Sequence, residues 1–381
     1  MKIAFFSNCY LPYLSGVTVA ITTLKESLEK LGHKVFVICP KYPSHPATQP
    51  PIFRLPSIPA PYPGYRLVWP YSYKIFKRLR DEKVDIIHTH QPFGIGLAAM
   101  CLARKMRVPF VYSFHTLFSR YVHNIPLLPK RLSAFLISTY LTWFCNQADV
   151  VIVGTKMVRR YLKACGVKTR IEVIPTGVEL QTANIKQQSN LKHETSKKAK
   201  TLLYTGRLSK EKNIEFLLDA FPEIEKQEPD IQLILVGGGP LEEEIRNKAK
   251  QISSKIIVTG LKSREEVLEY CHKADIFVYA SRTETQGLVL TEAKACGLPI
   301  VAVFSGALVD VVQDGIDGYL VPPNQDKFVE RVINLLKNDS LRAEMGTKAM
   351  KDIEENFSTD KTAEKFVQLY LSWRGSALKH S

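Results

Sequence analysis

Short apolar runs alternate with stretches of helical periodicity along most of the chain. Strands are expected in the first half at Lys2–Ser7, Lys34–Cys39, Asp85–His88, Phe110–His115, Val150–Gly154 and Arg170–Ile174. A second series is expected at Thr201–Thr205, Gln232–Val236, Ile256–Thr259, Ile276–Tyr279 and Pro299–Ala302. Helices follow most of these strands, for example at Val19–Leu31, where four apolar residues share one face: Ile21, Leu24, Leu28 and Leu31. This alternation predicts parallel α/β architecture in two Rossmann-like halves.

Two stretches interrupt the alternation. Pro40–Pro63 is rich in proline, has neither period, and is expected to be an ordered loop. Gln181–Lys200 is polar and almost free of large apolar residues, which is typical of a linker or surface loop. At 381 residues the chain exceeds what one core usually organises. We therefore expect domains at 1–178 and 179–359, with a C-terminal helix at about 360–381 that packs back on the first.

The composition is that of a globular protein without a membrane span. The longest apolar stretch, Ala134–Phe144, is too short for a bilayer core and carries a serine and two threonines. The N-terminus runs directly into a β-like segment and lacks the regions of a signal peptide, so we expect a cytoplasmic location. The seven cysteines have no metal-ligand spacing and are expected to be reduced core residues.

The positive charge is concentrated in the first half. Residues 1–170 hold 24 Lys and Arg against 6 Asp and Glu, whereas the whole chain has a net charge of +15. Such asymmetry indicates an anionic surface as partner, either nucleic acid or acidic lipid, although solubility alone also accounts for a basic surface.

The segment ASRTETQGLVLTEAKACG, directly after the strand expected at Ile276–Tyr279, carries the densest group of candidate functional residues. Glu284 lies in its loop, Gly287 permits close backbone approach, and a helix is expected at Leu288–Cys296. A helix N-terminus offers free N–H groups and a positive dipole end, which suits a pyrophosphate. From its position further along the helix, Glu292 is expected to accept hydrogen bonds from ribose hydroxyls. Glu284, in the loop, is expected to reach the sugar.

This segment resembles the signature of the retaining glycosyltransferases of family 4, which have the GT-B fold. The signature is two glutamates separated by seven residues, here Glu284 and Glu292. The resemblance implies a nucleotide-sugar donor and an active site in the cleft between two Rossmann-like domains. It also implies that Glu284 contacts the donor sugar, that Glu292 contacts the ribose, and that three backbone amides hold the diphosphate: those of Gly287, Leu288 and Val289.

Three more segments resemble the family's motifs in the same order along the chain. GRLSKEKN resembles its phosphate-binding segment, with Arg207 and Lys212 in the places of the basic pair. Two cations there would stabilise the charge that develops on a departing diphosphate. LPYLSGVT resembles the family's glycine loop, where Gly16 would bring backbone against the phosphates. LVGGGP resembles a strand-to-turn element, whose glycines are expected to form the turn.

Three histidines follow strands of the first half. His115 matches a family histidine that lines the donor-sugar and acceptor site, and the resemblance makes it a catalytic residue together with Glu284, Arg207 and Lys212. His88 and His90 match a second strand-end pair, and we expect His88 to be structural. The histidines lack zinc-site spacing, and the sequence contains no Asp-x-Asp. No essential metal or other cofactor is expected, because the basic pair would offset the diphosphate charge.

The acceptor is inferred from departures from the family pattern. Gln286 replaces the phenylalanine that most relatives carry, and His115–Pro126 adds aromatic residues and a second His–Asn pair. Both variations resemble the family members that glucosylate diacylglycerol. Basic residues also lie among aromatic ones, as a helix on an acidic bilayer requires. The residues expected to dock on the membrane are Lys74, Lys77, Arg78, Arg80, Lys130 and Arg131.

The sequence thus predicts a hexosyltransferase, with glucose of UDP-glucose as the expected donor sugar and diacylglycerol as acceptor, acting peripherally at the inner face of a membrane. An ordinary surface helix is the alternative for the basic stretch. The same chemistry on phosphatidylinositol, a glycolipid or a soluble sugar is a second hypothesis. A nucleic-acid-binding protein is a third, against which no helix-turn-helix, zinc-finger or RRM signature is present. An epimerase of the same fold is the fourth.

Overall fold

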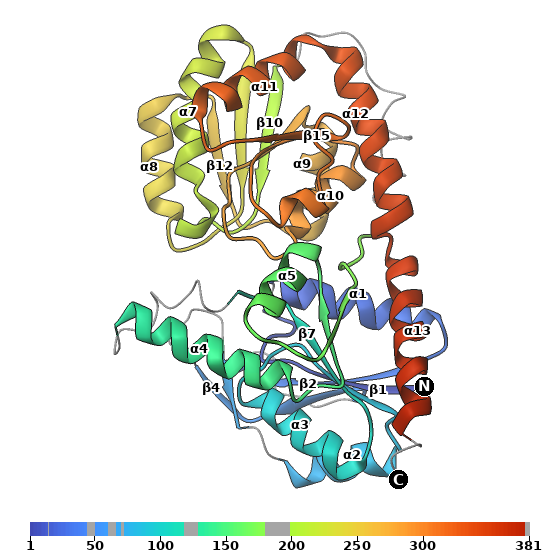
Figure 1. Cartoon of the computed structure of the whole chain (residues 1–381). Helices are drawn as coiled ribbons and strands as arrows, with labels where there is room; N and C mark the ends of the chain where they lie inside the picture. The colour runs from blue at the N-terminus through green and yellow to red at the C-terminus, as the bar shows by residue number, and fades with distance from the viewer. Residues whose placement is uncertain are drawn as a thin grey trace. The chain divides into compact units, whose positions relative to one another are not determined.

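The chain forms two compact units, each built on a parallel sheet (Figure 1). The computed structural model describes residues 1–13, 15–43, 50–59, 66–69, 72–117, 129–179 and 199–377. The first unit comprises Met1–Gly177 and Thr359–Ser381, and the second comprises Val178–Ser358. Within the described ranges, no helix combines the length and the apolar character needed to cross a bilayer.

The first unit contains a parallel sheet of seven strands in the order β3-β2-β1-β6-β7-β8-β9. These strands are β1 (Lys2–Phe6), β2 (Lys34–Pro40), β3 (Ile52–Leu55), β6 (Ile86–Thr89), β7 (Phe110–Phe114), β8 (Val150–Val153) and β9 (Arg170–Val173). A separate antiparallel pair joins β4 (Ser57–Pro59) to β5 (Arg66–Val68).

Helices cover both faces of this sheet. They are α1 (Gly16–Lys30), α2 (Tyr73–Asp81), α3 (Ile95–Met106), α4 (Lys130–Cys145), α5 (Lys156–Ala164) and α13 (Thr359–Ala377). Successive residues of a strand point to opposite faces. Accordingly Ile3 and Phe5 belong to a core that includes α1 and α13, whereas Ala4 and Phe6 belong to a second core with helices α2 to α5. The last helix of the chain is therefore part of the first unit.

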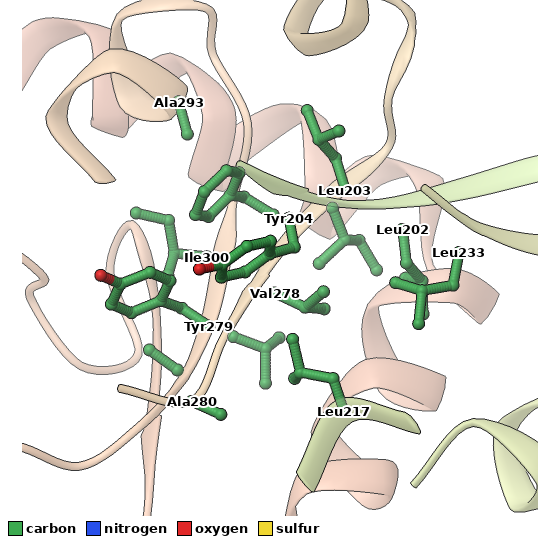
Figure 2. Close-up of a cluster of buried hydrophobic side chains, with 14 of the residues drawn as sticks. Leu202, Leu203, Tyr204, Leu217, Leu233, Val278, Tyr279, Ala280, Ala293 and Ile300 are labelled. Atoms are coloured by element: carbon green, nitrogen blue, oxygen red, sulfur yellow. The ribbon is translucent and has the colours of Figure 1, made fainter. Parts of the chain in front are cut away.

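The second unit is a six-stranded parallel sheet in the order β12-β11-β10-β13-β14-β15. Its strands are β10 (Lys200–Thr205), β11 (Ile231–Val236), β12 (Ile256–Gly260), β13 (Ile276–Tyr279), β14 (Ile300–Val303) and β15 (Gly318–Val321). Its α-helices are α7 (Ile214–Gln227), α8 (Glu242–Ile252), α9 (Arg264–Lys273), α10 (Leu288–Ala295), α11 (Gln325–Lys337) and α12 (Asp339–Asp352). Its described residues also form the short helices η5 (Lys210–Lys212) and η6 (Leu308–Asp310) and the π-helical turn η7 (Ile353–Phe357). One continuous core holds these elements, and Figure 2 shows part of it around Tyr204 and Tyr279.

The parallel α/β architecture and the two Rossmann-like halves predicted from the sequence are confirmed. The prediction for Pro40–Pro63 is wrong in its described part, which contains β3 and β4. Because β3 lies at the edge of the sheet and pairs only with β2, the prolines that flank it remove no ladder hydrogen bond from a central strand. Most of the expected linker Gln181–Lys200 lies outside the described residues, and Lys200 already opens β10.

Two expectations about burial are also wrong. Leu31, expected to share the apolar face of a helix at Val19–Leu31, is 46% exposed because α1 ends at Lys30 and Leu31 is its C-cap. Cys101, on α3, is exposed, and Cys165 is partly buried; the other five cysteines are buried, and all seven are free thiols.

Candidate active site

The candidate residues of the second unit gather where β10 and β13 end. In a parallel sheet the carboxyl ends of neighbouring strands share one edge, which is where ligands of such folds bind. β10 leads into the loop that carries Arg207 and then into η5, whose last residue is Lys212. β13 leads into the loop that carries Glu284. Because β10 and β13 are hydrogen-bonded neighbours, the two loops meet.

Glu284 is the centre of this group. Its carboxylate is buried, and one oxygen, Oε1, accepts three hydrogen bonds. Lys212 Nζ donates at 2.5 Å, and the hydroxyls of Tyr279 and Ser281 each donate at 2.7 Å. Lys212 also reaches the Tyr279 hydroxyl at 3.3 Å. With Oε1 held in this way, the carboxylate has a fixed orientation.

The charge state of Glu284 follows from two opposing effects. Burial raises the pKa of this carboxyl, but the positive charge of Lys212 and the hydrogen bonds from Lys212, Ser281 and Tyr279 lower it. The net pKa is lower than the ordinary value of 4.5, so the group is an anion at neutral pH. The site therefore contains an ionised Glu–Lys pair that is largely shielded from water.

A second strand-to-turn loop fixes the segment that carries Arg207. A Cβ on Gly237 would lie 1.9 Å from the Gly206 carbonyl oxygen, and one on Gly239 would lie 2.3 Å from the Leu208 carbonyl oxygen. Leu208 N donates to the Gly238 carbonyl at 2.9 Å. These glycines are thus needed for the close approach of two backbone segments, in addition to the turn expected from the sequence. The Arg207 carbonyl accepts a hydrogen bond from the Tyr204 hydroxyl at 3.1 Å.

The glycine of the glutamate segment opens helix α10. Gly287 is the N-cap of α10 with φ +82°, a conformation that favours glycine, and it makes no side-chain capping hydrogen bond. Leu288 and Val289 form the first turn, so their N–H groups point to the helix N-terminus. Glu292 is half-buried on the same helix, and burial raises the pKa of its carboxyl while the charge of Arg264 opposes that shift.

Beyond the predicted residues, a buried ion cluster anchors α10. Lys294 and Asp317 are fully buried, and Lys294 Nζ lies 2.7 Å from Asp317 Oδ2. The same ammonium group pairs with Asp352 and donates to the Val311 carbonyl at 2.7 Å. Gln313 donates from its side chain to Asp352 and from its backbone to Asp317. The helix that presents Glu292 is therefore tied to η6, the β15 turn and α12.

The candidate histidines of the first unit also lie at or just after the carboxyl ends of strands. His115 comes directly after β7, and its Nε2 lies 3.0 Å from His90 Nδ1, with the two rings stacked at 20°. His88, on β6, is fully buried between the hydroxyls of Tyr370 and Ser113, each 2.7 Å from one ring nitrogen. The two partners of His88 support the structural role expected for it.

All three histidines are neutral at neutral pH. Burial lowers the pKa of His115 to about 4, and it lowers the pKa values of His88 and His90 well below 6.5, with smaller contributions from the neighbouring imidazoles. A neutral imidazole has one donor and one acceptor nitrogen. In the contact between His90 and His115, one ring nitrogen therefore donates a hydrogen bond to the other. His90 Nε2 is buried and has no hydrogen-bond partner among the described residues.

The remaining predicted residues lie in the first unit. Gly16 is exposed at the start of α1, after Ser15, whose hydroxyl caps the helix by accepting from Thr18 N at 3.1 Å. The α2 residues expected to dock on a membrane are all exposed: Lys74, Lys77, Arg78 and Arg80. Arg131 is exposed on α4, and Lys130 is the first residue of that helix. Most of His115–Pro126 lies outside the described residues.

Sequence reasoning missed Tyr279 and Ser281, which hold Glu284, and Lys294, which anchors α10. A tyrosine and a serine directly before the glutamate loop were visible as polar residues at a strand end, where side chains of such folds meet ligands. Lys294 carried no such signal, because a lysine in a helix is normally exposed. Among the described residues, no group of three His, Cys, Asp or Glu side chains is placed to hold a metal ion.

Comparison with known proteins identifies families and individual proteins that this chain is similar to. Residues 14–182 match the family described as Glycosyltransferase Family 4, and residues 185–352 match Glycosyl transferases group 1. Alpha-monoglucosyldiacylglycerol synthase of Streptococcus pneumoniae is 34% identical over 335 residues, which cover 84% of this chain and 75% of that protein. The protein of the same name from Acholeplasma laidlawii is 31% identical over 380 residues, covering 91% and 93%.

Solved structures share the architecture. The Anabaena protein HepE, in complex with UDP and glucose, matches with a TM-score of 0.74 and 16% identity, over 98% of this chain and 100% of that one. At this identity the likeness concerns the fold.

Proposed function

The chain belongs to glycosyltransferase family 4 and has the GT-B fold, and from this premise we propose that it transfers glucose from UDP-glucose to the free hydroxyl of diacylglycerol at a membrane surface. The anomeric configuration of the sugar is retained. The protein acts from the cytoplasmic side as a peripheral membrane enzyme without an essential metal.

The observation that carries the donor half of this proposal is the ion pair between Lys212 and Glu284. Oε1 of Glu284 is held by three donors, so the sugar meets a carboxylate of fixed orientation. Lys212 and Arg207 supply positive charge beside the place where a diphosphate would leave, and the N-terminus of α10 supplies N–H groups. Glu292, further along α10, accepts hydrogen bonds from the ribose.

The chemistry requires one bond to form and one to break on the same face of the sugar. The anomeric carbon loses its bond to the diphosphate oxygen and gains a bond to the acceptor oxygen. The acceptor hydroxyl proton passes to the departing phosphate oxygen. The cations stabilise the charge on the diphosphate, and His115 contacts the sugar and the acceptor. Glu284 is not required as a nucleophile in this scheme, in contrast to the paired carboxylates of retaining glycosidases.

The acceptor half rests on two kinds of support. One is the similarity to two proteins named alpha-monoglucosyldiacylglycerol synthase. The other is the exposed surface around helix α2. Helix α2 exposes four cations, and large apolar side chains are exposed beside them, with Trp69 70% and Tyr73 63% exposed. Cations next to aromatic residues fit the interface of an acidic bilayer.

A panel of donors and acceptors tests the proposal. The enzyme is incubated with labelled UDP-glucose, UDP-galactose or GDP-mannose, and with diacylglycerol, phosphatidylinositol, a glycolipid or a soluble sugar. The expected product is α-glucosyl diacylglycerol with release of UDP, formed equally in EDTA. Preferential transfer to a soluble sugar would refute the lipid acceptor. Loss of activity in EDTA, restored by magnesium or manganese, would refute the metal-free scheme.

Docking on acidic lipid gives a separate prediction. Each Lys or Arg close to an anionic surface contributes about 1 kcal/mol, and the attraction decays within a Debye length of about 10 Å at 0.1 M salt. Neutral residues at Lys74, Lys77, Arg78 and Arg80 together should release the protein from acidic vesicles, measured by co-sedimentation over a salt series. Transfer to a short-chain acceptor in detergent should persist.

Helix α5 offers a control with the same change in charge. It carries four exposed cations on another helix of the same unit: Lys156, Arg159, Arg160 and Lys163. Neutralising these four should leave most vesicle binding intact. If both sets weaken binding equally, the attraction comes from net charge and the assignment to α2 is wrong.

A further inference from the structure

An apolar groove of about 390 Å³ runs between α2 and α3 in the first unit. This volume is in the range of pockets that hold small ligands. The groove is lined mainly by apolar side chains of the two helices: Phe76, Leu97, Ala98, Leu102 and Met106. Cys101, the exposed thiol, also lines it. We call this feature the α2–α3 groove.

The length of the groove matches one acyl chain. Its lining on α3 extends from Gly94 to Met106, and a helix rises about 1.5 Å per residue, so this wall is about 18 Å long. One leaflet of a bilayer accounts for half of a hydrocarbon core of about 30 Å. A single lipid tail of about 15 Å therefore covers most of this wall.

The Gly94 end of the groove is attached to the strand end that carries His90. A Cβ on Gly96 would lie 2.1 Å from the Gln91 carbonyl oxygen, so the first turn of α3 packs directly on the residue after His90. Asn8, at the end of β1, donates to the Phe93 carbonyl at 3.4 Å. The groove thus leads along α3 from the loop that follows the histidine-bearing strand.

The rim of the groove is positively charged. Lys77, Arg80 and Lys105 line it and are exposed, and none of the described lining residues is acidic. None of these three cations forms an ion pair with another described residue. Long basic side chains place their alkyl stems on apolar surface and keep the charged ends in water or among lipid headgroups. The opening of the groove therefore suits the surface of an acidic bilayer.

We propose that the α2–α3 groove binds one acyl chain of the diacylglycerol acceptor, with the glycerol end at Gly94 and the chain terminus toward Met106. This inference rests on the proposed function and adds a subsite to it. A neutral acceptor fits the charge pattern, because the cations at the rim contact the headgroups of surrounding acidic lipids while the uncharged tail lies on the apolar floor. The glycerol hydroxyl is then at the His90 end.

A groove-filling variant tests the proposal. Ala98 lies on the groove wall and is partly buried, so Ala98→Trp fills the space. Ala164→Trp makes the same change at an exposed position on α5 and is the matched control. Transfer is measured in neutral detergent micelles with dioctanoylglycerol and with dibutanoylglycerol, whose short chains cannot occupy the groove.

We expect Ala98→Trp to raise KM for dioctanoylglycerol at least tenfold, with little change for dibutanoylglycerol and no change in Ala164→Trp. An equal effect on both acceptors, or none on either, would overturn the proposal. If the wild-type protein transfers sugar to neither diacylglycerol, the proposed function itself fails. The two failures are therefore distinguishable.

The thiol of Cys101 gives a second readout that does not depend on turnover. In a Cys165→Ser background, Cys101 is the one thiol left among the described residues that is not buried. Its maleimide labelling rate is measured in micelles with and without each acceptor. Dioctanoylglycerol should slow labelling several-fold and dibutanoylglycerol should not. Equal protection by an acidic phospholipid without diacylglycerol would assign the groove to that lipid and overturn the proposal.

Discussion

In each unit the candidate residues lie at the carboxyl ends of the strands of a parallel sheet. The two groups differ in charge, because one is ionised and the other is neutral. In the second unit, Glu284 is ionised and paired with Lys212. In the first unit, His88 and His90 are buried, His115 is partly buried, and all three are neutral. Fixed charges suit a diphosphate, which enters and leaves as an anion. Neutral donors and acceptors suit hydroxyl groups, so the contrast supports the proposal that the second unit binds the donor diphosphate and that the first unit contacts sugar or acceptor hydroxyls.

The second unit also contains the buried charges of Lys294, Asp317 and Asp352, which we expect to stabilise the fold. The largest expected effect is the loss of stability when this cluster is broken. Lys294→Met removes the cation shared by Asp317 and Asp352, which leaves two buried carboxylates without it. Breaking a buried ion pair by removing one partner costs about 3–5 kcal/mol. We expect a loss of that size in the free energy of unfolding, measured by denaturant titration. Lys327→Met, which breaks an exposed pair with Glu330, is the control and should cost less than about 1 kcal/mol. Similar losses in both variants would contradict a stabilising role for the cluster.

The charges around Glu284 should instead affect the rate. Glu284→Ala, Lys212→Ala and Arg207→Ala should each lower kcat about 100-fold, since one preorganised electrostatic contact contributes about 3 kcal/mol in the transition state. Lys210→Ala, an exposed residue of the same short helix, should leave kcat unchanged. Circular dichroism checks that each variant is folded. Near-native turnover in any of the first three would remove that residue from the donor site.

The neutral histidines predict that the first unit loses stability first on acidification. The folded pKa of His115 is about 4 against 6.5 for the free side chain, so between these values the unfolded state binds more protons. Stability therefore falls as the pH drops from 6.5 toward 4, by about 2 kcal/mol at pH 5 for His115 alone. Glu284, with its lowered pKa, contributes stability that is lost only below its ordinary value of 4.5.

Hydrogen exchange at pH 7 and pH 5, resolved by peptide, measures this difference between the units. Amides of the first unit should lose more protection than those of the second, and His115→Asn should reduce the loss. A uniform decrease in both units, unaffected by the substitution, would contradict the assignment of buried neutral histidines.

The sequence predicted the central strands and the edge strands β9 and β12, but it missed the edge strands β3 and β15. β3 has only four residues between prolines, and β15 follows a turn whose glycines interrupt any period. A Cβ on Gly318 of β15 would lie 2.5 Å from the Ile300 carbonyl oxygen. This contact exists only after β14 and β15 have paired, so no local pattern reports it.

For the site, the spacing of residues within the motifs was sufficient to select Glu284 and Lys212. It could not identify the side chains that form hydrogen bonds with them. Tyr279 and Ser281 reach the same carboxylate oxygen because the loop after β13 folds back within five residues. The buried cluster of Lys294 depends on contacts with residues 23 and 58 positions away. Such partners are determined by tertiary packing, which a single sequence does not display.

The most direct test of the account is the binding of UDP by calorimetry to the wild-type protein, Lys212→Ala and His115→Ala, with transfer measured in parallel. We expect Lys212→Ala to weaken UDP binding at least tenfold, whereas His115→Ala should bind UDP as the wild type does and lose transfer. Normal UDP binding by Lys212→Ala, together with loss of UDP binding in His115→Ala, would contradict the assignment of the donor diphosphate to the charged group of the second unit.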